Sequence, residues 1–281
     1  MKTNNIANIQ DLLKKELPET QFQWLQSVVS DFKNDNDEKN LFFNFSLCSR
    51  QLKGIVGKYK VFDFCPAMNL IEWSRNYILL SYINQISSPF FEIYKKLKVT
   101  ADLHETLALY KGICLYPYSE DLKKSAEEGL RSNMKEVFES VALDNDFPAK
   151  HFEEESWNQM ILKALFVEAP IYRIKNFESR KNEELSRMVT DYALERIAAS
   201  RSIHPELWRC VKIVENKRIL DHWQKLLESG NEIEQSAIKL TLDTQLSEVK
   251  NIGLASSTKK YPLKSWEEIG QALEKQRKGI S

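Results

Sequence analysis

The sequence has 281 residues, of which 42% are hydrophobic and 28% are charged, so its composition excludes a disordered chain. Forty Lys and Arg residues balance forty Asp and Glu residues, which argues against nucleic-acid binding through bulk charge. Only eight glycines and eight prolines are present, too few for the many turns of a sheet-rich fold. The composition therefore predicts an all-α protein with no sheet.

Three local features bear on where the protein works. No apolar stretch approaches the roughly 20 residues of a membrane-spanning helix, and residues 1–5 lack the pattern of a secretory signal. The four cysteines lack CxxC spacing, so we expect them to be free buried thiols; they are Cys48, Cys65, Cys114 and Cys210. These features predict a cytoplasmic protein with no transmembrane segment, and they leave open a peripheral contact with a membrane surface.

The first third of the chain predicts helices separated by prolines and polar turns. Apolar residues recur at helical spacing over 6–13, 22–32 and 41–52. Pro66 is then expected to open a longer helix that runs through Ile83. Pro89 and the turn at 100–102 separate the next two helices.

The remainder continues the same helical pattern. The apolar stripe over 122–141 predicts a helix that Gly129 can split, and a turn follows at 145–148. Residues 249–263 are expected to be irregular, and Ser265 to Glu268 form a capping box for a last helix. Further helices are predicted at 157–167, 185–196, 205–214, 216–229 and 232–247.

About a dozen helices with short connections favour an irregular stack of helical hairpins over a single four-helix bundle. This arrangement is a HEAT-like α-solenoid, or α–α superhelix, although no strict repeat is visible. We expect one continuous domain with three parts. These are an N-terminal helical part (1–100), a central helical-hairpin region (101–248), and an irregular connection with a C-terminal helix (249–281).

The motifs of common enzyme classes are absent from the sequence. It contains no GxGxxG, GxxxxGK[ST], GxSxG or HExxH motif. None of the four histidines follows a glutamate by three residues, as a helical di-iron site requires. We therefore predict no catalytic residue, no cofactor and no metal site, and whether the protein is an enzyme stays open.

Lys163 interrupts the apolar run 160–167, where a lysine partly enclosed by neighbouring helices needs a partner or a lowered pKa. Three interpretations stay open. The side chain extends to the surface, or it forms an ion pair or a ligand anchor, with Glu136 or Glu139 as natural partners, or it is a reactive amine.

Polar residues near Lys163 suggest a pocket across a helical hairpin. Asn133 and Glu136 form a polar edge on one predicted helix, and Asn158 lies beside Trp157 on the next. The alternative is that these groups only hydrogen-bond between helices, and the apolar stripe around Trp157 favours a core role for its ring. The candidate ligand-binding residues are Arg131, Asn133, Glu136, Trp157, Asn158 and Lys163.

The middle of the chain also carries mixed polar and apolar strings that chance rarely produces. The most specific is WNQM (157–160), followed by LKALF (162–166). Others are LALYKG (107–112), RSNM (131–134), FPA (147–149) and HPELWR (204–209). Over roughly residues 105–210 the sequence resembles the EboA family, named for a gene of a bacterial cluster linked to secondary-metabolite traffic.

The resemblance implies a cytoplasmic helical protein without an established catalytic role. It also implies neighbours in the gene cluster that resemble a metal-dependent hydrolase, a membrane prenyltransferase and a sugar-phosphate cyclase. We therefore expect a non-catalytic protein that binds a small metabolite or another protein of the same cluster during its biosynthesis or traffic. One alternative is an enzyme that acts on a polar or phosphorylated metabolite through Lys163 and Glu136. Another is a protein-binding scaffold.

Overall fold

The computed structural model describes residues 2–32, 38–54, 56–85, 89–212, 216–245 and 261–279. Over these ranges the chain forms fifteen α-helices and three short 3-10 helices, and it contains no β-strand. The only strand-like feature in these ranges is an isolated bridge between Tyr59 and Met68. The all-α prediction is confirmed, while the solenoid arrangement stays a prediction.

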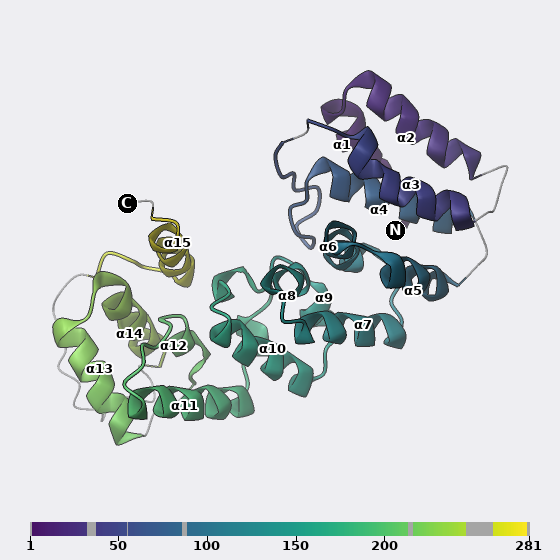
Figure 1. Cartoon of the computed structure of the whole chain (residues 1–281). Helices are drawn as coiled ribbons and strands as arrows, with labels where there is room; N and C mark the ends of the chain where they lie inside the picture. The colour runs from purple at the N-terminus through teal and green to yellow at the C-terminus, as the bar shows by residue number, and fades with distance from the viewer. Residues whose placement is uncertain are drawn as a thin grey trace. The chain divides into compact units, whose positions relative to one another are not determined.

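The helices fall into two compact units, which we call unit 1 (Met1–Phe152) and unit 2 (Glu153–Ser281). Figure 1 labels the helices of both units in chain order. The predicted three-part division at residues 100 and 248 stays a prediction.

Over its described residues, unit 1 contains nine α-helices and one 3-10 helix. They are α1 (Lys2–Glu16), α2 (Glu19–Asp31), α3 (Glu38–Gln51), α4 (Leu70–Gln85), α5 (Phe90–Thr100), α6 (Leu103–Lys111), η1 (Gly112–Leu115), α7 (Glu120–Arg131), α8 (Lys135–Ala142) and α9 (Phe147–His151).

Helix α4 lies at the centre of unit 1, where it packs against α1, α2, α3 and α6 (Figure 1). Its residues are buried on nearly all sides, which is typical of a core helix. The sequence predicted that this helix begins at Pro66, but it begins at Leu70. The reason is a reciprocal cap, because the Asn69 side chain accepts from the Glu72 backbone N–H while the Glu72 carboxylate accepts from the Asn69 N–H, both at 2.9 Å.

The predicted 122–141 helix is divided into α7 and α8, but the break lies at residues 132–134 rather than at Gly129. Gly129 instead sits inside α7 at a close approach to α6. A Cβ atom at this position would lie 2.8 Å from Cζ of Tyr110. Gly129 is therefore a packing residue and not a helix breaker.

The part of unit 2 that the structure describes contains six α-helices and two 3-10 helices. They are α10 (Glu154–Phe166), η2 (Ile171–Arg173), η3 (Glu178–Arg180), α11 (Glu183–Ala198), α12 (Leu207–Cys210), α13 (Lys217–Ser229), α14 (Glu232–Gln245) and α15 (Trp266–Arg277). Helix α12 is much shorter than the predicted 205–214 helix, and Val214 itself lies outside the described residues. The helix ends early because the Lys212 backbone N–H bonds to the Ser186 hydroxyl at 2.9 Å, away from a helical register.

The C-terminal helix α15 follows a stretch, 246–260, that holds most of the predicted irregular connection and lies outside the described residues. Ser265 caps the helix as predicted, by accepting from the Glu268 backbone N–H at 3.1 Å. The Glu268 carboxylate, however, accepts from Lys264 rather than from Ser265. Gly270 lets the helix approach η2, since a Cβ atom there would lie 2.0 Å from Cδ1 of Tyr172.

All four cysteines are free thiols, and three of them are buried, while Cys114 is half-buried. Cys65 and Cys114 are 49 positions apart in the sequence, yet their Sγ atoms lie 2.8 Å apart. Burial raises the pKa of the Cys48 thiol to about 12 and that of Cys65 well above its usual range. These two thiols are therefore protonated at neutral pH.

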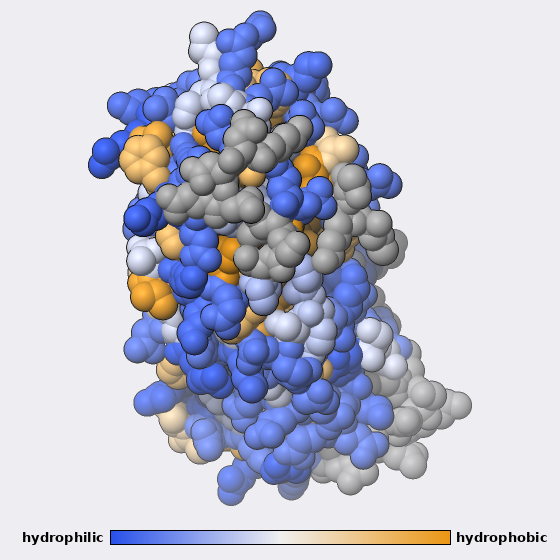
Figure 2. Space-filling model, turned by 90° about the vertical axis from the view of Figure 1, so that its right-hand side faces the viewer, coloured by the Kyte–Doolittle hydropathy of each residue, from blue (hydrophilic) through white to orange (hydrophobic). Residues whose placement is uncertain are grey.

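On the face drawn in Figure 2, hydrophobic side chains lie singly or in small groups among hydrophilic ones. Among the described residues, no helix combines the length and the apolar character that a membrane crossing requires.

Candidate functional site

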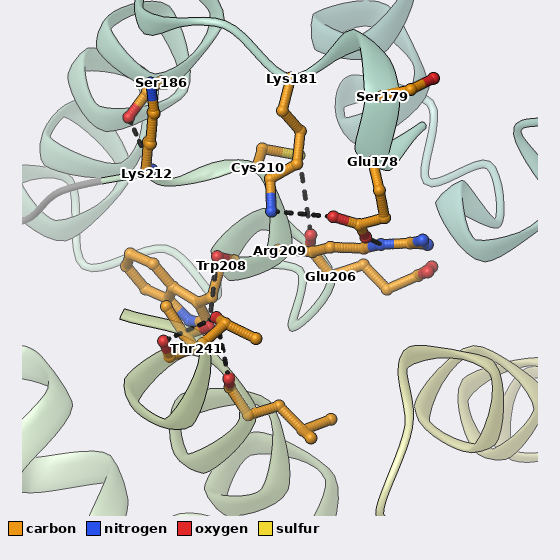
Figure 3. Close-up of polar contacts among 12 residues, drawn as sticks. Glu178, Ser179, Lys181, Ser186, Glu206, Trp208, Arg209, Cys210, Lys212 and Thr241 are labelled. Carbon is orange, nitrogen blue, oxygen red and sulfur yellow. Dashed lines mark hydrogen bonds and ion pairs between the residues drawn. The ribbon is translucent and has the colours of Figure 1, made fainter. Parts of the chain in front are cut away.

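Helix α12 and the turn before it are fixed at the centre of unit 2 by contacts to four neighbouring elements. The Trp208 carbonyl accepts from the Thr241 hydroxyl at 3.2 Å, which ties α12 to α14 (Figure 3). The Lys212–Ser186 bond ties the chain after α12 to α11. These contacts hold the short helix in place and, with it, the preceding segment 202–205.

Glu206 anchors the end of the same segment. The Glu206 side chain is fully buried. Its two carboxylate oxygens accept from the backbone N–H groups of Ile171, at 3.0 Å, and of Tyr172, at 2.6 Å. These donors begin η2, where a carboxylate supplies the acceptors that a helix start requires. Burial raises the pKa of Glu206 to about 7, against the opposing effect of the two N–H groups.

Glu178, in η3, pairs with Arg209 of α12 and with Lys181, which follows η3 (Figure 3). It accepts from Nε of Arg209 at 2.7 Å and from Nζ of Lys181 at 3.1 Å. Partial burial acts to raise the pKa of Glu178, but the bonds and positive charges of Arg209 and Lys181 lower it overall. The Arg209 guanidinium also lies 4.7 Å from the centroid of the Phe177 ring.

A pocket of about 370 Å³ lies within unit 2 and is lined in part by the segment 202–205. We call it the unit 2 pocket. Its walls combine apolar side chains with titratable ones, and its volume lies in the range of small-molecule sites. The lining residues are Leu165, Phe166, Glu168, Tyr192, Arg196, Ser202, Ile203, His204, Pro205, Asn231, Ile233, Glu234, Leu273, Gln276 and Arg277.

Arg196 lies on one wall of the unit 2 pocket, where two nearby residues hold its side chain. Its Nε donates to the Ser202 carbonyl at 2.5 Å, and its Nη1 donates to the Tyr192 hydroxyl at 3.1 Å. Its guanidinium carbon lies 5.6 Å from the centroid of the Tyr192 ring. The arginine is thus oriented by neutral groups.

Three of the sequence-predicted ligand residues belong to unit 1. Arg131 ends α7, Asn133 lies in the break between α7 and α8, and Glu136 is in the first turn of α8. All three side chains are exposed. Their role in ligand binding stays a prediction.

The other three predicted residues lie on α10 in unit 2. Trp157 and Asn158 are buried, and the guanidinium of Arg180 lies 5.0 Å from the Trp157 ring centroid. The Asn158 amide exchanges two hydrogen bonds with the Asn182 amide, at 3.1 and 2.8 Å. Lys163 is half-buried, and desolvation lowers its pKa. This pair of asparagines ties α10 to the start of α11.

Sequence reasoning did not select the residues of the unit 2 pocket, although three of them lie in segments that the sequence had singled out. Arg196 is the last polar residue of a predicted amphipathic helix, and His204 opens the HPELWR string. Phe166 ends the LKALF string, and in the structure its side chain is 71% exposed. What the sequence does not contain is the position of α15, which brings Leu273 and Arg277 to the same cavity.

These observations define an all-α protein in which a central short helix fixes the wall of a small-molecule-sized pocket. The model of the EboA family, described as metabolite traffic protein EboA, matches residues 5–212, so the chain belongs to the EboA family. The match extends the resemblance seen at 105–210 to most of unit 1, and it leaves α13, α14 and α15 outside. No curated protein and no solved structure matches the chain.

Proposed function

We propose that this protein binds a small metabolite in the unit 2 pocket and carries or presents it without transforming it. The description of the family as a metabolite traffic protein supports a role in moving such a molecule. The observation that carries the proposal is the pocket itself, whose volume and mixed walls suit a small organic ligand.

The position of the pocket also supports carriage. One wall comes from the family-matched region, through Arg196 and His204, and the other comes from α14 and α15. Two walls from different helices can enclose a ligand and release it when one of them moves. Binding in this pocket requires no reaction at Lys163.

Native mass spectrometry of the full-length protein, freshly purified from a cell extract, tests the proposal. We expect a discrete mass surplus that organic extraction removes. Leu273→Trp places a large ring on the pocket wall and should abolish the surplus. Gln271→Trp adds the same ring at an exposed position of the same helix, outside the pocket, and should retain it.

A surplus that persists in Leu273→Trp would place the ligand elsewhere. In that case the sequence-predicted residues offer the next site, and the Asn158→Ala, Lys163→Ala double variant should remove the surplus. A bare mass in every preparation would contradict metabolite binding and would favour the protein-binding scaffold.

A further inference from the structure

The charges that line the unit 2 pocket are not equally available to a ligand. Glu168 lies 3.0 Å from Nη2 of Arg277, so these two residues form an ion pair. Glu234 closes a capping box at the start of α14, because its carboxylate accepts from the Asn231 backbone N–H at 2.9 Å while the Asn231 side chain accepts from the Glu234 N–H at 3.0 Å. Both carboxylates are thus engaged within the fold.

Arg196 differs from these groups. Among the described residues, no carboxylate lies within ion-pair distance of its guanidinium, and its hydrogen-bond partners, Ser202 and Tyr192, are neutral. A guanidinium has five N–H donors, and these two contacts use two of them. An arginine that is already oriented can hold an incoming oxyanion with little loss of side-chain entropy.

The same pocket also has an apolar surface. The Phe166 ring is 71% exposed, and the half-buried Ile233 and Leu273 line the cavity with it. An apolar ligand body would remove this surface from water, which is the main favourable contribution of such contacts. A ligand that uses both features therefore needs one anionic group and one apolar part.

We propose that the unit 2 pocket binds a small organic anion with an apolar body, whose oxyanion is held by Arg196 and whose body lies against Phe166. This inference rests on the proposed function and specifies the chemical class of the metabolite. Carboxylates and phosphates share the chemistry that Arg196 recognises, because the planar guanidinium donates two parallel bonds to either group.

Two fluorescent probes separate the anionic contribution from the apolar one. Anilinonaphthalene sulfonate carries a negative charge, and N-phenylnaphthylamine has the same aromatic body without the charge. Both are titrated into the full-length protein, and a dissociation constant is measured for each. We expect both to bind the wild type, with the charged probe bound more tightly.

Arg196→Gln should raise the dissociation constant of the charged probe by about tenfold or more, as expected for the loss of a charge-assisted hydrogen bond. The dissociation constant of the neutral probe should stay unchanged. Arg187→Gln is the matched control. It removes the same charge from the same helix, but Arg187 is exposed and already pairs with Glu184 and Asp191. We expect this control to bind both probes as the wild type does.

Phe166→Ala provides a second variant that does not depend on how Arg196→Gln folds, because an exposed ring contributes little to the core. It should weaken both probes by a similar factor. Displacement of the charged probe by octanoate or by octyl phosphate then distinguishes a carboxylate from a phosphate ligand, with octanol as the neutral competitor.

Equal affinity of the charged probe for Arg196→Gln and Arg187→Gln would overturn the inference, as would equal losses of both probes in Arg196→Gln. Its failure is distinguishable from failure of the proposed function. If a neutral metabolite co-purifies and is lost in Leu273→Trp, the proposed function is supported, but the proposal of an anionic ligand is contradicted. Probe binding that depends on Arg196, with no metabolite in any preparation, would retain the anion site and reject the function.

Discussion

In unit 1, the buried carboxylates Glu105 and Glu72 each have a cation beside them, Arg75 at 3.6 Å and Lys111 at 2.6 Å. In unit 2, the buried Glu206 has backbone N–H groups as partners, and no Lys or Arg of the described residues lies within ion-pair distance of it. Arg196, on the pocket wall, likewise has no carboxylate partner there.

This comparison separates two uses of charge. An ion pair inside a folded unit offsets the desolvation of both groups and leaves nothing for a ligand. A charged group that is held by neutral partners keeps its capacity to interact, either with a proton, as for Glu206, or with a ligand, as we propose for Arg196. Three predictions test this contrast, in order of decreasing effect.

The largest effect is expected at the paired charges of unit 1. Arg75 is 1% exposed, and its Nε donates to the Phe45 carbonyl at 3.1 Å. Arg75→Ala leaves the Glu105 charge buried without its cation and should lower the free energy of unfolding by about 3–5 kcal/mol. Urea unfolding followed by circular dichroism measures this, and the exposed Arg50→Ala should change it by less than about 0.5 kcal/mol. Equal effects of the two variants would remove the contrast between the units.

The second prediction concerns the pH dependence that Glu206 confers. Because its pKa is raised from 4.5 to about 7 in the fold, the folded protein binds a proton that the unfolded chain does not bind between these values. The free energy of unfolding should therefore fall as the pH rises from about 5 to 7, by up to about 3 kcal/mol, and should then level off. The pairing of a carboxylate with a cation would give the opposite slope.

Urea titrations at several pH values measure this slope. Glu206→Gln should remove it, since the amide does not titrate, whereas Glu195→Gln, at an exposed position of α11, should keep the wild-type slope. The positive charge of Arg209 and the negative charge of Glu274 act on Glu206 in opposite directions. An unchanged slope in Glu206→Gln would assign the titration to another group.

The smallest effect is expected at the asparagine pair, which joins neutral groups. Asn158→Ala removes both hydrogen bonds between the two amides, while Asn182 keeps its bonds to Arg180 and Leu185, and it should lower the free energy of unfolding by about 1–2 kcal/mol. In a double-mutant cycle with Asn182→Ala, we expect a coupling of about 1 kcal/mol. Additive effects would show that the two amides do not stabilise each other, and would leave Asn158 available for a ligand.

Much of the fold follows from the sequence because its signals are local. Proline positions and apolar spacing located most helices, and Ser265 caps α15 as its pattern indicated. The errors arose where a distant contact overrides a local preference. Gly129 lies inside α7, where the absence of a side chain allows Tyr110 to pack closely. The chain leaves the helical register at Lys212 because the Lys212 backbone N–H donates to the Ser186 hydroxyl.

The candidate site was less accessible to sequence reasoning. Spacing alone grouped Arg131, Asn133 and Glu136 with Trp157, Asn158 and Lys163, and these residues belong to two different compact units. The unit 2 pocket instead joins Phe166, Arg196 and Leu273, which together span more than 100 positions of the chain. A pattern within one helix carries no information about which distant helix covers it.

The sequence by itself determined the all-α class and the membership of the EboA family, because composition, helical periodicity and family strings are properties of neighbouring residues. Only the tertiary structure decided which charges are neutralised and which stay available. It placed a cation beside Glu105 but only backbone N–H groups beside Glu206, and it placed neutral groups around Arg196. The physical reason is that pairing and desolvation depend on distances between residues far apart in the chain.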